Sequence, residues 1–365
     1  MKIAFVCDTP YQCLNATNLF WNFYRGREDI RCDIYVVDQF AKAAAITESL
    51  KNKKLFDNVY FLRREENRFM PQGLKRSLRV AYSYLNTKNA VRNQFDGEIP
   101  KNKYDLIYSS VMTCFVSALI VLNPKAEFCL YDDGTGSYSG DIVANGGGTA
   151  YKLFSKLTGR GANAARASKL YVNNPDMCNS TAAEEICRMP AFTQEYLDVA
   201  YEIFGVTKRE GKMTGIVLLT YPALTPESDK DLQDIVDLMR PYSRQVLVRP
   251  HPRELGLERY EGFTVDTKGE MWELMISQMD MEQIALVGTY STAQITPKLL
   301  YGKEPRLIFT YKLANSLSAE TMSRFDVLVN EVCESYSNKD RIMVPKTVDE
   351  LRECMDTILG QQVSP

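Results

Sequence analysis

The sequence contains one histidine, His251, and so offers little for a metal site built from imidazoles. Its nine cysteines are scattered without CxxC spacing, which argues against a zinc or disulfide framework and favours reduced thiols in a cytoplasmic protein. The formal net charge of −2 lacks the strong basic excess of nucleic-acid-binding proteins. No apolar run approaches the ~20 residues that a transmembrane helix requires. These absences argue against a zinc protein, a nucleic-acid binder and a membrane-spanning protein.

Short apolar segments alternate with longer segments of helical periodicity along the 365 residues. This alternation predicts βαβ units with parallel sheets, and hence the α/β class. Ten strand-like segments are too many for one doubly wound sheet, and the polar segment 207–212 offers a break. We therefore predict two Rossmann-like domains at 1–205 and 213–345, a linker at 206–212, and a C-terminal helix and tail at 346–365. The strand-like segments are Ile3–Cys7, Asp33–Val37, Val59–Leu62, Leu106–Ser109, Phe128–Tyr131, Leu170–Val172, Ile216–Leu219, Val246–Arg249, Ile284–Val287 and Leu307–Phe309, and helices are expected over segments such as Leu14–Tyr24 and Asp229–Met239.

The single histidine follows a strand-like segment, in the run Arg249-Pro250-His251-Pro252-Arg253. The two prolines restrict the backbone on both sides of the imidazole, and two arginines flank it. In an open α/β sheet, the loop at the carboxyl end of a strand is where an anion-binding site forms. If the protein carries out acid–base chemistry through histidine, His251 is the residue that does so.

A second strand-like segment ends in two adjacent carboxylates and a glycine, Asp132-Asp133-Gly134. Adjacent side chains that leave a strand point to opposite faces, so we expect one carboxylate to turn into the fold and one to point outward. Gly134 would let the backbone approach a substrate closely. Neighbouring carboxylates often divide into a structural group and a base. The simpler alternative is an ordinary Asp-Gly turn without chemistry.

Two other loops follow strand-like segments with small or polar residues. Ser291 or Thr292 would cap the helix that comes after the segment 284–287. A capped helix N-terminus also favours a phosphate, although capping alone is the simpler explanation. Thr9 and Gln12 follow the first strand, where the GxGxxG fingerprint of a dinucleotide site is absent. This argues against an NAD-dependent oxidoreductase and leaves a pocket for an acceptor as the alternative.

Taken in order, the motifs at 9–12, 131–136, 250–253 and 291–292 resemble those of bacterial sialyltransferases. The resemblance is closest to glycosyltransferase family 52, which includes lipooligosaccharide and capsule sialyltransferases, and it spans most of the chain in short blocks. It implies a GT-B-type fold, in which the parallel sheets of two Rossmann-like domains face a central cleft. It also implies an inverting, metal-independent transfer of sialic acid from CMP-sialic acid to a hydroxyl of a surface glycan that ends in galactose. No cofactor is expected besides this donor substrate.

Through this resemblance, Asp133 is the expected base, and His251 is expected beside the donor phosphate. Asp229 is a competing candidate for the base, and Glu227 could take its place. Glu270 is expected at the ribose hydroxyls of the donor. The donor-binding residues are then His251, Pro252, Arg253, Glu270, Ser291 and Thr292, and the acceptor-binding residues are Thr9, Gln12, Asp132 and Gly134.

Two other functions are compatible with the same motifs. One is a GT-B glycosyltransferase of the same family that uses another nucleotide sugar, and the other is a non-catalytic sugar-nucleotide-binding protein of capsule assembly. The basic segment 63–79 is either a solvated helix face or a patch that meets an anionic acceptor or the inner face of a bacterial membrane. The sequence leaves open the acceptor, the linkage, whether one sugar or a polymer is added, and whether the chain forms a homodimer.

Overall fold

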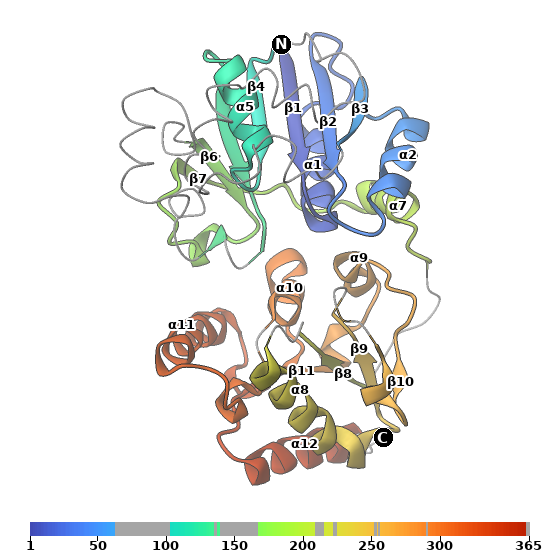
Figure 1. The fold of residues 1–365 in the computed structure, drawn as a ribbon, viewed down its shortest axis with the longest axis vertical. Coiled ribbons are helices and arrows are strands. Elements are labelled where there is room, and N and C mark those ends of the chain that lie inside the picture. Colours follow the sequence, from blue (N-terminus) through green and yellow to red (C-terminus); the bar gives the residue numbers. More distant parts are fainter. Residues whose placement is uncertain are drawn as a thin grey trace, which may run out of the picture. The chain divides into compact units, whose positions relative to one another are not determined.

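The computed structural model describes residues 1–62, 103–134, 137–138, 167–208, 215–221, 225–251, 254, 256–289 and 291–362 (Figure 1). The chain divides into two compact units, residues 1–205 and 206–365. Each unit contains a sheet whose described strand pairs are all parallel. The predicted α/β class with two parallel sheets is therefore confirmed. The basic segment 63–79, Pro252 and Arg253 lie outside the described residues.

The described residues of the first unit form a seven-stranded sheet in the order β3-β2-β1-β4-β5-β6-β7. Its first strand is apolar and buried from Ile3 to Cys7, as expected for a parallel strand that is covered on both faces. Because β1 pairs with β2 on one side and β4 on the other, the strand order reverses there, and the crevice between β1 and β4 is where such sheets bind ligands. The elements are β1 (Lys2–Cys7), α1 (Pro10–Phe23), β2 (Arg31–Val37), α2 (Ala43–Lys53), β3 (Asn58–Leu62), β4 (Leu106–Ser109), α5 (Cys114–Leu122), β5 (Glu127–Tyr131), β6 (Ala167–Val172), β7 (Ala183–Arg188) and α7 (Gln194–Phe204).

The described residues of the second unit form a six-stranded sheet in the order β10-β9-β8-β11-β12-β13. Here β8 lies between β9 and β11, so it holds the place that β1 holds in the first unit. The C-terminal helix belongs to this unit, because Leu351, Met355 and Ile358 are buried in the same apolar core as Val246 and Val248. The elements are β8 (Gly215–Leu219), α8 (Pro226–Met239), β9 (Val246–Arg249), β10 (Thr264–Val265), α9 (Trp272–Ser277), β11 (Ile284–Gly288), α10 (Thr292–Tyr301), β12 (Arg306–Phe309), α11 (Ala319–Ser335), β13 (Ile342–Met343) and α12 (Val348–Gln362).

The structure differs from the sequence prediction in two kinds of place. Helices α1 and α8 begin earlier than expected, because Thr9 and Thr225 cap them and a proline, with a fixed φ and no donor to satisfy, stands first in each. Strands β7, β10 and β13 were not predicted. The first carries exposed charged residues, and the other two span only two residues each, too few for an apolar pattern. In the described part of the chain, no helix combines the length and the apolarity needed to cross a membrane.

Candidate active site

Polar side chains gather where the strands of the first sheet end. Asp8 follows β1, Asp132 and Asp133 follow β5, and Asn173 follows β6. Because these strands are parallel, their carboxyl ends lie at one edge of the sheet, next to the point where the strand order reverses. Gln12, in the first turn of α1, completes the group. We refer to Asp8, Gln12, Asp132, Asp133 and Asn173 as the acidic edge.

Asp132 is wholly buried and joins the loops that follow β5 and β6. Its Oδ1 atom accepts a hydrogen bond from the N–H of Gly134 at 2.7 Å, and its Oδ2 atom accepts one from the Tyr138 hydroxyl at 2.6 Å. The Asn173 side chain donates to Oδ2 at 2.9 Å. Burial raises the pKa of the Asp132 carboxyl, while these hydrogen bonds oppose the increase. Asp132, which the sequence predicts on the acceptor side, therefore connects the loops that form the site.

Asp133 is partly exposed, so the two neighbouring carboxylates point as the alternation along a strand predicts. Its Oδ1 atom accepts a hydrogen bond from Nε2 of Gln12 at 2.7 Å, and its N–H donates to the Ser137 hydroxyl at 2.7 Å. Burial raises the pKa of the Asp133 carboxyl to about 6; the bond from Gln12 opposes this rise, and the charge of Asp132 adds to it. A carboxylate with a pKa near the working pH is suited to take a proton from a hydroxyl group.

Asp8 was not among the predicted site residues, yet it lies beside Asp133. Its N–H donates to Oε1 of Gln12 at 2.6 Å, and Nε2 of Gln39 donates to its Oδ1 atom at 3.2 Å. Burial raises the pKa of Asp8 to about 7, with the charge of Asp133 as the second cause. The sequence offered little to identify Asp8, because it is a single acid that follows a mostly apolar strand. Only the order of the strands brings it near Asp133.

Two residues that the sequence predicts on the acceptor side, Thr9 and Gln12, form hydrogen bonds within the fold at the acidic edge. The Thr9 hydroxyl accepts the N–H of Gln12 at 3.2 Å and so caps α1. Gln12 is buried, and its side chain joins the main chain of Asp8 to the carboxylate of Asp133. Gly134 has a φ of +91°, a left-handed conformation that favours glycine, and it turns the chain back at Asp132.

In the second unit, His251 lies just after β9 in a turn held by several hydrogen bonds. The N–H of His251 donates to the hydroxyl of Thr220, the residue that follows β8, at 3.0 Å. That hydroxyl in turn donates to Oε2 of Glu254 at 2.8 Å, and the N–H of Glu254 donates to the carbonyl of His251 at 2.8 Å. The turn therefore fixes the backbone of His251 from two sides. We refer to Thr220, His251, Glu254 and Ser291 as the histidine edge.

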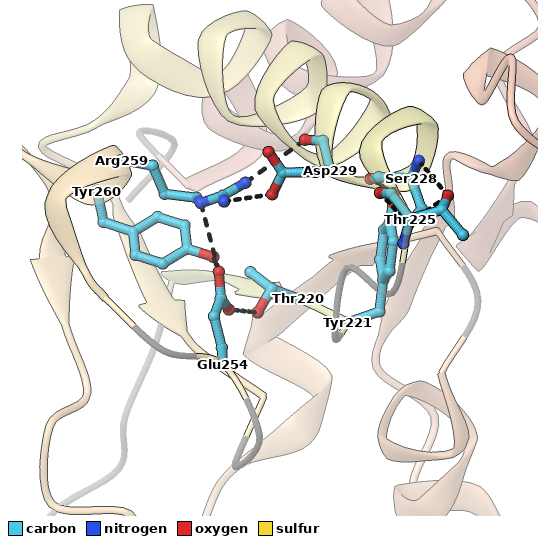
Figure 2. A network of polar contacts seen from close by, with 8 residues as sticks. All are labelled: Thr220, Tyr221, Thr225, Ser228, Asp229, Glu254, Arg259 and Tyr260. Carbon is cyan, nitrogen blue, oxygen red and sulfur yellow. Dashed lines mark hydrogen bonds and ion pairs between the residues drawn. The ribbon is translucent and has the colours of Figure 1, made fainter.

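Figure 2 shows how the network extends from Glu254 toward the start of α8. The Tyr260 hydroxyl donates to Oε1 of Glu254 at 2.5 Å, and Nε of Arg259 lies 3.5 Å from the same atom. Arg259 also forms an ion pair with Asp229 at 2.5 Å. The Asp229 side chain is 53% exposed, and its carboxylate is bound by a guanidinium. Asp229 thus differs from Asp133, whose carboxylate is bound by a neutral amide.

Ser291 caps helix α10, as the sequence predicted. Its hydroxyl accepts the N–H of Ala293 at 3.2 Å, and its own N–H donates to Oε1 of Gln294 at 3.1 Å. Gly288, at the end of β11, lies close to both the end of β8 and the first turn of α10, because a Cβ atom on it would come within 2.9 Å of the Leu219 carbonyl and 3.1 Å of Oε1 of Gln294. The strand order β9-β8-β11 therefore places His251 and the first turn of α10, including Thr292, on either side of the end of β8.

Two further residues on the predicted donor side have partners of their own. Glu270 is buried, and its Oε1 atom accepts the N–H of Thr207 at 3.0 Å, so this carboxylate fixes the start of the second unit. Arg249, which precedes the Pro-His-Pro sequence, forms an ion pair with Asp266 and donates to the carbonyl of Glu270. Its charge is therefore matched by an aspartate within the fold. Glu227 lies exposed in the first turn of α8.

No protein-family model matches the chain, and no curated protein matches it in sequence. The fold is similar to that of the GT-B domain of a sialyltransferase from Photobacterium damselae, with a TM-score of 0.51 at 12% identity over 94% of this chain and 100% of that one. It is also similar to the spinosyn forosaminyltransferase SpnP, with a TM-score of 0.51 at 12% identity over 99% and 91% of the two chains. UDP-GlcNAc 2-epimerase from Neisseria meningitidis gives a TM-score of 0.50 at 10% identity over 99% and 100%. These likenesses confirm the predicted GT-B type of fold.

Proposed function

We propose that the protein is an inverting glycosyltransferase that moves sialic acid from CMP-sialic acid to a hydroxyl of a glycan ending in galactose. The observation that carries the proposal is Asp133, a partly exposed carboxyl at the end of β5 whose pKa burial raises to about 6. A general base needs a pKa near the working pH, because it must be ionised and still bind the proton that it removes. The GT-B type of fold and the ordered motifs support the same reaction class.

Asp133 accepts the proton of the attacking hydroxyl in this reaction. Its carboxylate is oriented by Gln12, whose amide also binds the main chain of Asp8. Asp132 keeps the loop in place through its bonds to Gly134, Tyr138 and Asn173. The acceptor oxygen forms a bond to the anomeric carbon as that carbon's bond to the phosphate oxygen breaks.

The histidine edge stabilises the CMP that leaves. CMP departs as a phosphate monoester, whose charge the imidazole of His251 and the N-terminus of α10 can stabilise. Thr220 and Glu254 fix the turn that carries the imidazole. In the proposed reaction, the base takes the proton of the attacking hydroxyl and the imidazole stabilises the leaving phosphate, so a single displacement inverts the anomeric centre. CMP carries a single phosphate, so the donor has no diphosphate for a metal ion to bridge. The proposed reaction therefore uses no metal or other cofactor.

The choice of CMP-sialic acid rests on the resemblance of the motifs to those of sialyltransferases. Incubation of the protein with CMP-sialic acid and galactose-terminated oligosaccharides should give a sialylated product and free CMP in equal amounts. Absence of both products across such acceptors would overturn the proposal. Asp133→Asn is the matched control, because it preserves the shape of the side chain and removes the base.

Nucleotide binding separates this proposal from the two other functions. Thermal unfolding of the protein should shift upward with CMP or CTP, because a ligand that binds the folded state stabilises it. A shift with UDP or GDP and none with CMP would assign a different nucleotide sugar. A shift with CMP in a protein that neither transfers nor hydrolyses CMP-sialic acid would assign a binding protein without catalysis.

A further inference from the structure

Asp8 is a buried carboxyl group that the proposed reaction has not yet used. It is 4% exposed and follows directly on the apolar strand β1. Its Oδ1 atom accepts one hydrogen bond, from Gln39 at 3.2 Å, and its Oδ2 atom has no hydrogen-bond partner among the described residues. An ionised carboxylate in such surroundings is costly unless a cation or several donors compensate it. In the described part of the chain, Asp8 forms no ion pair.

A single side chain connects Asp8 with the proposed base. Gln12 is buried, and its Oε1 atom accepts the N–H of Asp8 at 2.6 Å while its Nε2 atom donates to Oδ1 of Asp133 at 2.7 Å. Because both ends of the amide are in use, its orientation is fixed. The same Gln12 amide therefore donates a hydrogen bond to the Asp133 carboxylate and accepts one from the backbone of Asp8. This connection fixes the position of the Asp133 carboxylate relative to the backbone of Asp8.

Among the described residues, the titratable groups that interact with the two acids are themselves acids or thiols. Asp132 adds its charge to the surroundings of Asp133, and Asp8 lies near Cys13, whose pKa burial raises well above the ordinary value. Cys7 contacts Cys13 from the end of β1. Among the described residues, neither Asp8 nor Asp133 is paired with a lysine or arginine. Two carboxyl groups in such a site cannot both ionise at low cost, so the first ionisation opposes the second.

We propose that Asp8 and Asp133 act as a carboxyl pair that carries one negative charge at neutral pH, with the proton on Asp8 and the charge on Asp133. This inference rests on the proposed role of Asp133 as the base. Asp8 is then a positioning residue that keeps a single charge in the buried site. When Asp133 takes the proton of the attacking hydroxyl, the charge of the pair changes from −1 to zero. When the proton leaves Asp133, the ready state returns.

The pair can be tested without any substrate. In protein labelled with ¹³C at the aspartate side-chain carboxyls, the Asp8 signal should titrate at about 7 in the wild type and at a lower pH in Asp133→Asn. The pKa of Asp8 falls there because the charge of Asp133, one of the two causes that raise it, is gone. An Asp8 signal that titrates near the ordinary value of ~4, or one that does not move in Asp133→Asn, overturns the pair.

Catalysis provides a separate readout. The wild type should show two inflections in its profile of kcat/KM against pH, near 6 for Asp133 and near 7 for Asp8. Asp8→Asn mimics the protonated form, so it should retain the lower inflection and lose the upper one. A profile in Asp8→Asn that keeps both inflections contradicts the part of the inference that concerns catalysis. Absence of any transfer would instead count against the proposed function and leave the NMR titration decisive for the pair.

Stability gives a third readout with a defined sign. The pKa of Asp8 is raised in the folded state, so the folded protein binds more protons than the unfolded one between pH ~4 and ~7. Stability should therefore fall as pH rises through this window, and Asp8→Asn should remove much of the fall. Asp38→Asn is the matched control, because Asp38 is an exposed carboxyl just after β2. This variant should leave the melting temperature and the titrations of Asp8 and Asp133 unchanged. Equal pH dependence in the wild type and Asp8→Asn contradicts the pair.

Discussion

The loops at the ends of the two sheets differ in how they bind carboxylates. At the acidic edge, the described partners of Asp8 and Asp133 are neutral amides, and burial raises the pKa of both groups. In the second unit, Glu254 of the histidine edge and the neighbouring Asp229 of α8 both contact the guanidinium of Arg259. A carboxylate bound by a cation has its charge matched in the fold, whereas one bound by an amide keeps its capacity to take up a proton.

The same contrast is visible where the strand order of each sheet reverses. In the first unit, β1 is followed by Asp8, whose pKa the charge of Asp133, the proposed base, helps to raise. In the second, Thr220 follows β8 and its hydroxyl fixes the His251 turn, while Gly288, at the end of β11 and before α10, lies close to the last residue of β8. In our proposal, one fold position thus serves proton transfer in one unit and anion binding in the other.

Asp133→Asn should have the largest effect on transfer. Without a group to accept the hydroxyl proton, kcat should fall by ~10²–10⁴-fold, while the fold and the affinity for CMP remain as in the wild type. Steady-state kinetics with CMP-sialic acid measures the change, and thermal unfolding checks the fold. A variant with near-normal turnover would remove Asp133 from the base role and break the contrast between the edges.

His251→Ala should have the next largest effect. Loss of one group that stabilises the leaving phosphate typically costs ~10²–10³-fold in kcat, and CMP should also bind more weakly. Release of CMP from CMP-sialic acid and CMP titration together measure both effects. Turnover close to that of the wild type would show that the single histidine has no part in the mechanism.

Thr220→Val should act through the His251 turn. It removes the hydroxyl that accepts the N–H of His251 and donates to Glu254, so both partners lose a hydrogen bond. We expect a lower melting temperature and a loss of kcat of up to ~10²-fold from misplacement of the imidazole. Thr220→Ser keeps the hydroxyl and is the control. Equal losses in Thr220→Val and Thr220→Ser would show that the hydroxyl does not position the turn.

Gly288→Ala should reduce stability more than activity measured per folded molecule. Its Cβ atom would lie 2.9 Å from the Leu219 carbonyl, and such overpacking costs ~1–3 kcal/mol. Denaturant unfolding measures the loss. Gly360→Ala, in α12 where a Cβ would meet nothing within 4 Å, is the control and should not be destabilised. An unchanged midpoint in Gly288→Ala would contradict the close approach of Gly288, at the end of β11, to the Leu219 carbonyl of β8.

Asp229→Asn should have the smallest effect. Its ion pair with Arg259 involves a side chain that is 53% exposed, and such pairs contribute ~0–1 kcal/mol. Transfer should stay within a few fold of the wild type. This variant, compared with Asp133→Asn, decides between the two carboxylates that the sequence left as candidates for the base. A loss in Asp229→Asn as large as that in Asp133→Asn would move the base to the second unit.

The sequence predicted correctly those features that depend on the residues of a single strand or helix. The buried strands showed as apolar runs, the alternation along β5 predicted that Asp132 and Asp133 point to opposite faces, and Ser291 was expected at a helix start. The cap at Ser291 needs only the residues that follow it, which is why the sequence could predict it.

Contacts between distant segments could not be predicted in the same way. Gln12 and Asp133 are 121 residues apart, and only the order of the strands brings them together. Glu270 and Arg249 stand in runs that suggested donor contacts, yet the fold gives them the Thr207 amide and the Asp266 carboxylate as partners. An isolated acid or arginine in a sequence carries no mark of such a partner.

The most direct test of the proposed division is calorimetric titration of CMP into the wild type, Asp133→Asn and His251→Ala. We expect Asp133→Asn to bind CMP with the Kd of the wild type, although it no longer transfers sialic acid. For His251→Ala we expect a Kd at least about tenfold higher, since a hydrogen bond to a charged group contributes ~1.5–3 kcal/mol. Equal affinity in the wild type and His251→Ala, or a loss of CMP binding in Asp133→Asn, would contradict the assignment of proton transfer to one edge and nucleotide binding to the other.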